Sequence, residues 1–262
     1  MTRILLTNDD GIEAPGLRAL LQALTPLGEV MVFAPDHNWS AAGHTKTMHK
    51  PLRVDRYSLD CPPTDDERDS VEAYTTTGAP SDCVALALLG ILPQKPDLVI
   101  SGINQGANLG HDLTYSGTVA AAMEAVIFGL PAVAVSLDSY SSHDFVNAAQ
   151  IAAQVVGQVK ERGLPPGTFL NVNVPDRPPE EIAGVAITRL GRRVYRDILV
   201  ERHDPRGRPY YWIGGEPPSG HLDDGTDVWA VANGYVSITP IHLDMTAHDL
   251  VPVLQDWQFQ VQ

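Results

Sequence analysis

Short apolar runs alternate with longer amphipathic stretches over the first two thirds of the chain. The first run covers residues 3–7, leucines then recur at helical spacing over 15–24, and a second apolar run covers 30–34. Runs this short are typical of buried strands, and the spacing between them is typical of an amphipathic helix. The order strand, helix, strand predicts two parallel strands joined by a right-handed crossover.

The same alternation continues toward residue 174. We expect further strands at 51–56, 73–77, 96–101, 131–136 and 169–174. We expect helices through 84–89 with Ser81 as N-cap, from Ser116 into an alanine-rich stretch, and over about 145–162. The predicted fold class is therefore α/β, with a doubly wound, mostly parallel sheet forming a core domain over about residues 1–183.

The pattern changes after residue 183. Residues 184–262 favour β-ribbons at 185–188, 193–198, 210–213 and 235–239, followed by a helical tail over 247–257. Seven arginines lie between Arg189 and Arg208, although the chain has only 18 basic residues. They are either solvated hairpin edges or part of an arm that contacts another subunit or an anionic ligand. The pattern favours an oligomerisation arm and a C-terminal helix that packs on the core or on a partner subunit.

Composition narrows the class of partner. The 262 residues carry a net charge of -14, which disfavours a nucleic acid duplex and requires local positive groups for any anionic substrate. The two cysteines offer neither a disulfide framework nor zinc-ligand spacing. No apolar run approaches the roughly 18 residues of a membrane span, and the N-terminus lacks the apolar core of a signal peptide. We therefore expect a cytoplasmic protein with no membrane partner.

Asp9 and Asp10 follow the first strand directly. Two adjacent carboxylates repel each other, so keeping both ionised favours a nearby positive charge. Carboxylate oxygens suit hard divalent cations. A solvated turn explains Asp and Gly here equally well, so this stretch by itself leaves both interpretations open.

Two other strand exits supply oxygen ligands. Ser40 lies in the loop after the second strand, and Asn104 follows the strand at 96–101. Parallel strands place such exits at one edge of the sheet, so these side chains are expected to meet Asp9 and Asp10. Two carboxylates, a hydroxyl and an amide form an all-oxygen shell that selects Mg²⁺ or Mn²⁺ over zinc.

The segment Ser116, Gly117 and Thr118 opens a predicted helix. Free N–H groups at a helix start form a ready anion site, although a simple helix cap uses the same residue types. Asn38 lies in the loop that carries Ser40, and Asn108 lies in the loop after the strand at 96–101. Both are candidates for substrate contacts. Together these residues are candidates for phosphate and substrate binding.

Several blocks in order resemble the SurE family of stationary-phase survival proteins. They are Ile4–Ile12 (ILLTNDDGI) with Ala14-Pro15-Gly16, Ala34-Pro35 with Ser40, residues 77–84, residues 101–104 with Gly106, Asn108, Gly110, Asp112 and residues 115–118, and residues 234–240. Ala79 and Ser81 replace the commoner threonine and alanine, and the arginine-rich ribbon matches no family pattern. The resemblance runs nearly from end to end.

The resemblance implies a Rossmann-like core and a metal-dependent 5'-nucleotidase that acts on nucleoside monophosphates. It implies one divalent cation per subunit, Mg²⁺ or Mn²⁺, on Asp9, Asp10, Ser40 and Asn104. It also implies a β-hairpin and C-terminal segment exchanged between subunits, giving a homodimer or homotetramer. Base preference, 5' against 3' phosphates and activity on polyphosphate stay open.

A receiver or nucleotide-sensing module is the alternative of a different class. A carboxylate pair after the first strand also occurs in phosphoacceptor domains, but those run to only about 120 residues on the flavodoxin-like plan. They have no need of the block from Asn104 to Thr118. We therefore favour direct attack on phosphate by a metal-activated water, with Asp9 or Asp10 as proton acceptor and no phosphoenzyme.

Overall fold

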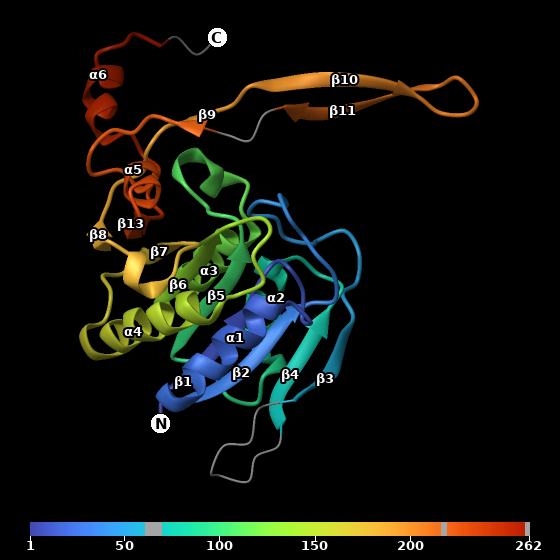
Figure 1. The fold of residues 1–262 in the computed structure, drawn as a ribbon, viewed down its shortest axis with the longest axis vertical. Helices are drawn as coiled ribbons and strands as arrows, with labels where there is room; N and C mark the ends of the chain where they lie inside the picture. Colours follow the sequence, from blue (N-terminus) through green and yellow to red (C-terminus); the bar gives the residue numbers. More distant parts are fainter. Residues whose placement is uncertain (61–69, 216–218, 260–262) are drawn as a thin grey trace.

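The fold is described by a computed structural model for residues 1–60, 70–215 and 219–259. Within these residues, nine strands form one sheet in the order β3-β4-β2-β1-β5-β6-β7-β13-β8 (Figure 1). The strands are β1 Arg3–Thr7, β2 Glu29–Pro35, β3 Val54–Asp60, β4 Ser70–Thr76, β5 Leu98–Gln105, β6 Ala132–Asp138, β7 Thr168–Pro175, β8 Gly184–Ile187 and β13 Tyr235–His242. The six from β4 to β7 in this order are parallel, which confirms the predicted α/β class.

Helices cover both faces of the sheet. One face carries α1 Pro15–Leu24 and α4 Val146–Arg162, and the other carries α2 Pro80–Leu86 and α3 Gly117–Ile127. Successive side chains of a strand point to opposite faces, so Ile4 and Leu6 pack on the first layer and Leu5 on the second. Full burial of each such side chain contributes roughly 1.5–3 kcal/mol. Among the described helices, none is both long and apolar enough to cross a bilayer.

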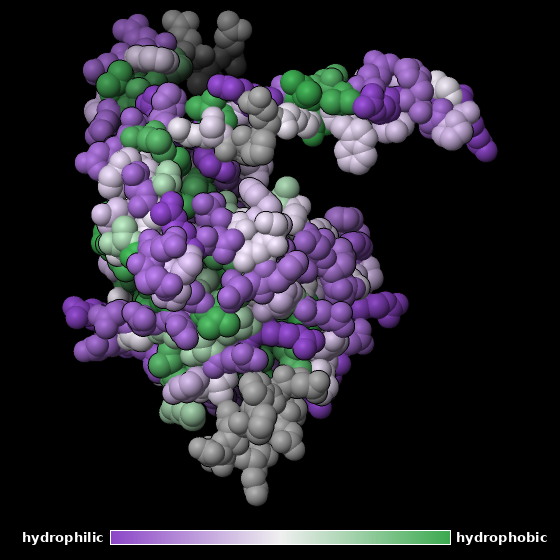
Figure 2. Space-filling model, viewed as in Figure 1, coloured by the Kyte–Doolittle hydropathy of each residue, from purple (hydrophilic) through white to green (hydrophobic). Residues whose placement is uncertain are grey.

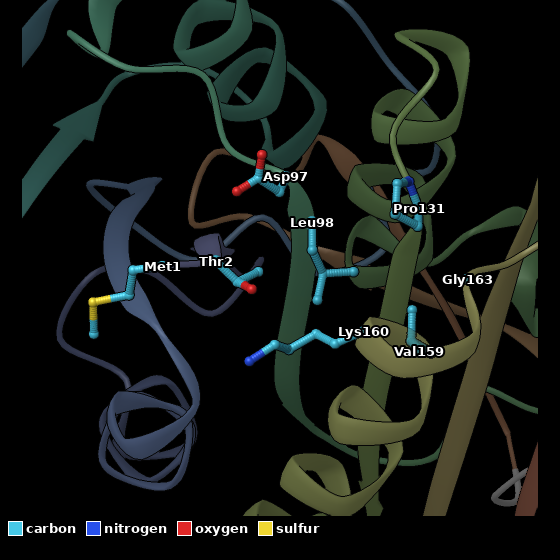
Figure 3. A pocket seen from close by; sticks show the side chains of 8 residues that line it. All are labelled: Met1, Thr2, Asp97, Leu98, Pro131, Val159, Lys160 and Gly163. Atoms are coloured by element: carbon cyan, nitrogen blue, oxygen red, sulfur yellow. The ribbon is translucent and has the colours of Figure 1, made fainter.

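The two edges of the parallel sheet differ. A cavity of about 520 Å³ lies where β1 and β5 begin, between Thr2, Leu98 and Lys160 (Figure 3). The carboxyl ends of the same strands lie at the opposite edge. The loops after β1, β2 and β5 gather there, and these loops carry the residues that the sequence singles out.

The main sheet extends beyond the domain boundary predicted at residue 183. β13 pairs antiparallel with β7 and parallel with β8, so these two segments belong to the main sheet and not to a β-ribbon. The predicted ribbon assignment for 185–188 and 235–239 is therefore wrong. β13 is far from β7 in the chain and β8 joins the sheet through β13, and local pattern does not reveal such non-local pairing.

Several element boundaries differ from the prediction. Strand β5 extends from Leu98 to Gln105, so Asn104 lies within the strand and does not follow it. The antiparallel strand β3 begins at Val54, three residues later than expected. The strand predicted at 193–198 is divided into β9 Arg193–Val194 and β10 Asp197–His203. Helix α2 begins at Pro80, so Ser81 is not its N-cap; instead, the Asp82 carboxylate accepts the Ala79 N–H at 2.9 Å.

An arm projects from the body of the molecule (Figure 1). It consists of β10 and β11 Pro209–Gly215, an antiparallel hairpin that β9 and β12 Ser219–Gly220 connect to the body. Helix α5 Asp227–Ala232 precedes β13, and the tail forms η5 His248–Leu250 and α6 Val251–Gln255. Apolar side chains on the hairpin face solvent in this single chain, and Ile213 is 82% exposed (Figure 2). The expected hairpin and helical tail are therefore present.

Candidate active site

A cavity of about 280 Å³ opens at the carboxyl edge of the sheet. Three of the four predicted metal ligands line it, namely Asp9, Ser40 and Asn104. Asn108 and Ser116, two of the predicted substrate contacts, line it as well. The parallel strands thus bring together side chains that lie more than 100 positions apart in the chain.

Asp9 lies at the base of this cavity and is only 3% exposed. The Thr118 hydroxyl donates a hydrogen bond to Oδ1 of Asp9. A Cβ atom added at Gly117 would lie 2.7 Å from Cβ of Asp9, so the close approach of α3 requires glycine. Gly117 and Thr118 therefore contact Asp9 without lining the cavity themselves.

The pKa values of both aspartates are raised when no cation is bound. Burial raises the pKa of Asp9 from 3.8 to about 6, against hydrogen bonds from Thr118 that lower it and with a further rise from Asp10. Burial also raises the pKa of Asp10, whereas hydrogen bonds from the Gln105 N–H and from Asn38 lower it. A divalent cation beside this pair would relieve both the burial and the mutual repulsion.

Asp10 lies beside the cavity and is not among its lining residues. Nδ2 of Asn38 donates to Oδ1 of Asp10 at 3.1 Å, and Oδ1 of Asn38 accepts the Ser40 N–H at 2.7 Å. Asn38 thus links Asp10 to the loop that carries Ser40. The contacts of Asn38 support a role in orienting two ligands, which differs from the substrate contact predicted for it.

The two other asparagines have fixed orientations. Nδ2 of Asn104 donates to the Gly106 carbonyl at 2.7 Å, which leaves the amide oxygen of Asn104 as the donor for a cation. Nδ2 of Asn108 donates to the Ser136 hydroxyl at 2.8 Å, and the Asn108 N–H donates to Oδ1 of Asn173 at 2.8 Å. The amide of Asn173 also donates to the Asn108 carbonyl, so the loop rests on a buried polar cluster.

Sequence reasoning missed this cluster. Asn171 and Asn173 are both fully buried in β7, and the amide of Asn171 also donates to the Asn108 carbonyl, at 2.9 Å. Two asparagines inside the otherwise apolar run FLNVNV are an available signal, because buried polar groups need hydrogen-bond partners. Their shared partner Asn108, in the loop after β5, depends on the fold and cannot be recognised from the sequence alone.

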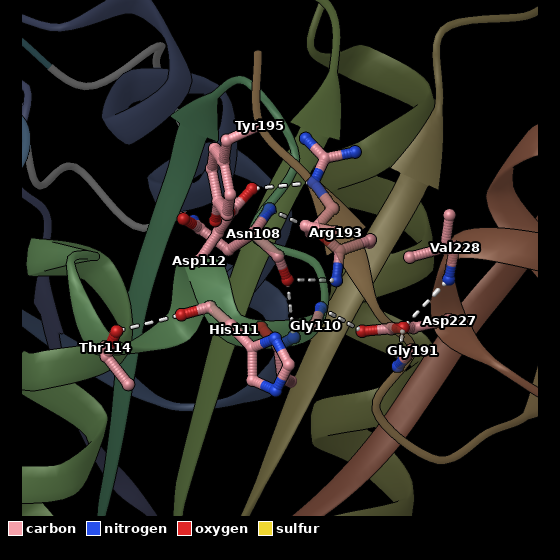
Figure 4. A network of polar contacts seen from close by, with 12 residues as sticks. Asn108, Gly110, His111, Asp112, Thr114, Gly191, Arg193, Tyr195, Asp227 and Val228 are labelled. Atoms are coloured by element: carbon pink, nitrogen blue, oxygen red, sulfur yellow. Dashed lines mark hydrogen bonds and ion pairs between the residues drawn. The ribbon is translucent and has the colours of Figure 1, made fainter. Parts of the chain in front are cut away.

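The arm reaches the same cavity (Figure 4). Nε of Arg193 donates to Oδ2 of Asp112 at 2.8 Å, and the Tyr195 hydroxyl donates to Oδ1 of Asp112. Both Asp112 and Tyr195 line the cavity. Burial, together with the hydrogen bond to Asp112, raises the pKa of Tyr195 to about 12, so its hydroxyl stays protonated. Arg193 belongs to the arginine-rich segment between residues 189 and 208, but no local sequence pattern predicts its contact with Asp112.

Asp227 links the arm to the loop over the cavity (Figure 4). This carboxylate is fully buried at the start of α5. It accepts the N–H of Gly110 at 2.8 Å and that of Gly191 at 2.7 Å. The loop that follows Asn108 and the segment that leads into β9 are therefore tied to one side chain.

The donor set fits a hard divalent cation. Within the described part of the chain, no three His, Cys, Asp or Glu side chains converge, so the arrangement does not suit zinc. Carboxylate, hydroxyl and amide oxygens do converge around the cavity, and these are the ligands that Mg²⁺ and Mn²⁺ prefer.

Comparisons with known proteins agree with this geometry. The family model described as survival protein SurE matches residues 4–197. The chain is 52% identical over 260 residues to the 5'-nucleotidase SurE of Chloroflexus aggregans, covering 98% of this chain and 99% of that protein. It is 53% identical over 250 residues to the 5'-nucleotidase SurE of Herpetosiphon aurantiacus, covering 95% of each.

A solved structure matches as well. The crystal structure of the SurE protein from Aquifex aeolicus superposes with a TM-score of 0.79 at 42% identity, covering 97% of this chain and 98% of that one. Fold and cavity define an α/β protein whose oxygen-lined site lies where parallel strands end. The family match and the two relatives then identify this chain as a member of the SurE family.

Proposed function

We propose that this protein is a divalent-metal-dependent phosphomonoesterase that releases phosphate from nucleoside 5'-monophosphates. The observation that carries the proposal is one cavity lined by Asp9, Ser40 and Asn104, beside the N-cap Ser116 of α3. Such a cavity offers oxygen ligands for a cation and donors for phosphate oxygens. Relatives about half identical over nearly the whole chain carry the name 5'-nucleotidase, which supports the same activity.

One Mg²⁺ or Mn²⁺ per subunit would be held by Asp9, Asp10, Ser40 and Asn104. When bound, such a cation polarises a phosphoryl oxygen and lowers the pKa of a coordinated water. Asp10 would require a small change in its hydrogen bonds to Asn38 and Gln105, because both of its carboxylate oxygens are already engaged.

The residues of the chain bind phosphate and move a proton. Asn108 and Ser116 line the cavity and would face the phosphate oxygens. Gly117 and Thr118 do not line it, so they would take part only through their backbone N–H groups at the start of α3. The Asp9 carboxylate, which lines the cavity, would accept a proton from the attacking water. The attack is direct, and no aspartyl phosphate forms.

Further features of the proposal extend beyond this site. We also propose that 3'-monophosphates and short polyphosphates are substrates. We further propose that the protein is cytoplasmic and that it does not bind a nucleic acid duplex. We also propose that the hairpin and C-terminal segment hold a homodimer or homotetramer, which would bury the exposed apolar side chains of β10 and β11. We propose a catalytic core over residues 1–183, whose sheet β8 and β13 complete, and an oligomerisation arm within 184–262.

Phosphate release from AMP and GMP tests the activity directly. We expect turnover with added Mn²⁺ or Mg²⁺ and none after complete removal of metal by EDTA. Activity that survives full chelation would contradict the metal mechanism.

A phosphoacceptor sensor predicts a different result. Incubation with a small phosphodonor such as acetyl phosphate would give a stable adduct 80 Da heavier, about the mass of one phosphoryl group, without turnover. Intact mass spectrometry therefore separates the two functions, and we expect no adduct.

A further inference from the structure

Three tyrosines stand around the mouth of the cavity that holds Asp9 and Ser40. Tyr115 precedes α3, Tyr140 follows β6 and Tyr195 follows β9 of the arm. Their exposed fractions are 62%, 72% and 41%, respectively. Aromatic rings thus border a cavity whose base is polar.

Contacts within the protein position the rings of Tyr140 and Tyr195 and the backbone of Tyr115. The Tyr140 ring rests on Gly106, where an added Cβ would lie 2.6 Å from Cε1 of the ring. The Tyr115 carbonyl accepts the Gly43 N–H at 2.9 Å, which joins this residue to the loop that carries Ser40. The Tyr195 hydroxyl is bound to Asp112. The rings of Tyr140 and Tyr195, which are held in this way, lose little side-chain entropy when a flat ligand covers them.

The polar side chains nearest these rings are already engaged. Nε2 of Gln105 donates to the carbonyls of Tyr140 at 3.2 Å and Ser142 at 3.0 Å. Both carboxylate oxygens of Asp112 accept hydrogen bonds from the arm. Nδ2 of Asn108 donates to Ser136. These hydrogen bonds fix the orientation of the three side chains and use part of their hydrogen-bonding capacity within the protein.

We propose that Tyr115, Tyr140 and Tyr195 form a platform that binds the nucleobase of the substrate through ring contacts and does not discriminate among bases. The proposal rests on the proposed function, which places the phosphate at Asp9 and so directs the nucleoside outward to the cavity mouth. Every base has a π-face, so stacking on aromatic rings tolerates any base. The substrate class is thus nucleoside monophosphates in general, and purines gain only from their larger rings.

Steady-state kinetics on AMP, GMP, CMP, UMP and the base-free ester ribose 5-phosphate tests the platform. We expect Tyr140→Ala to raise KM for all four nucleotides by about 5- to 100-fold, the range found for loss of one stacking contact. Its kcat/KM for ribose 5-phosphate should stay within about twofold of wild type, because that ester has no base. Tyr140→Phe is the matched control and should keep wild-type KM values. Tyr115→Ala should repeat the pattern of Tyr140→Ala.

The outcomes separate this inference from the function on which it rests. No metal-dependent phosphate release from any of these esters would contradict the proposed function itself. Release with an unchanged nucleotide KM in both alanine variants would contradict the platform alone. An equal loss for ribose 5-phosphate, or a preference above about 100-fold for one base in the wild type, would contradict it as well.

Discussion

Gly117 and Asp9 show how tightly individual residues define the candidate site. The substitution Gly117→Ala places a Cβ 2.7 Å from Cβ of Asp9, so Asp9 or α3 must move. We expect a loss of about 1–3 kcal/mol of stability, as for other overpacked sites, and at least tenfold lower kcat. Urea denaturation and phosphate release measure the two effects.

Gly157 provides the matched control for this substitution. It lies inside α4, and nothing is within 4 Å of a Cβ added there. Gly157→Ala should therefore stabilise the protein by about 0.5–1 kcal/mol through helix propensity, with unchanged kcat. Equal behaviour of the two variants would show that α3 does not constrain Asp9.

Asp9→Asn separates function from stability at a single residue. The folded-state pKa of Asp9, about 6, lies above its ordinary value of 3.8, so ionisation at neutral pH favours the unfolded chain. Stability from this residue is therefore full below pH 3.8 and is lost as the pH rises through 6. We expect the variant to have no turnover, yet to be more stable than the wild type in EDTA at pH 7, on the order of 2–3 kcal/mol.

Denaturation in EDTA at pH 4 and pH 7 checks this prediction. The advantage of Asp9→Asn should be present at pH 7 and nearly absent at pH 4, where the wild-type carboxyl is largely protonated. Retained turnover would remove Asp9 from the catalytic residues.

At the scale of elements, a buried carboxylate ties the loop with Ser40 to α3. Oε1 of Glu124 accepts a hydrogen bond from Nζ of Lys46 at 2.7 Å, and Oε2 contacts Nε2 of His44 at 2.9 Å. Burial acts to raise the pKa of Glu124, but the hydrogen bonds from His44 and Lys46 outweigh it and lower the pKa overall. The anchor is therefore strongest while Glu124 is ionised.

This anchor predicts an acid-sensitive contribution to stability. With a lowered folded-state pKa, the contribution is present above the ordinary value of 4.5 and is lost as the pH falls through the folded-state pKa. Glu124→Gln should lower stability by about 1–3 kcal/mol at pH 7 and flatten its fall toward pH 3. Urea denaturation across this pH range measures both, and the exposed Glu161→Gln is the control. An unchanged acid limb would contradict the anchor.

The elements also show what local pattern predicts. The parallel core was predicted because each buried strand is an apolar run. The order of these strands determines the edge of the sheet at which Asp9, Ser40 and Asn104 meet. β8 and β13 were misassigned because β13 pairs with β7 across a long stretch of chain and β8 joins the sheet only through β13. Tyr140 and Tyr195 were missed for the same reason, since exposed aromatics in loops carry no periodic signal.

At the scale of the whole molecule, the hairpin predicts an assembly. Leu199 and Ile213 are paired in register across β10 and β11 and are 68% and 82% exposed in the single chain. The wild type should scatter light as a particle of at least twice the 28.3 kDa chain mass. Leu199→Lys with Ile213→Lys should lower that mass, because burying either lysine in an interface is unfavourable.

Val146→Lys is the control for this pair of substitutions. Val146 is a similarly exposed apolar residue at the start of α4, away from the hairpin. It should leave the particle mass unchanged. A wild-type particle of single-chain mass at micromolar concentration would contradict the proposed assembly.

The contact of Tyr195 and Arg193 with Asp112 has a thermodynamic consequence. The segment that closes one wall of the cavity is also the base of the arm through which copies are proposed to associate. Two binding equilibria that share a structural element are linked reciprocally, so a ligand in the cavity and a neighbouring copy each change the affinity for the other by the same factor. Dilution should then weaken nucleotide binding, and nucleotide should lower the concentration at which the copies separate.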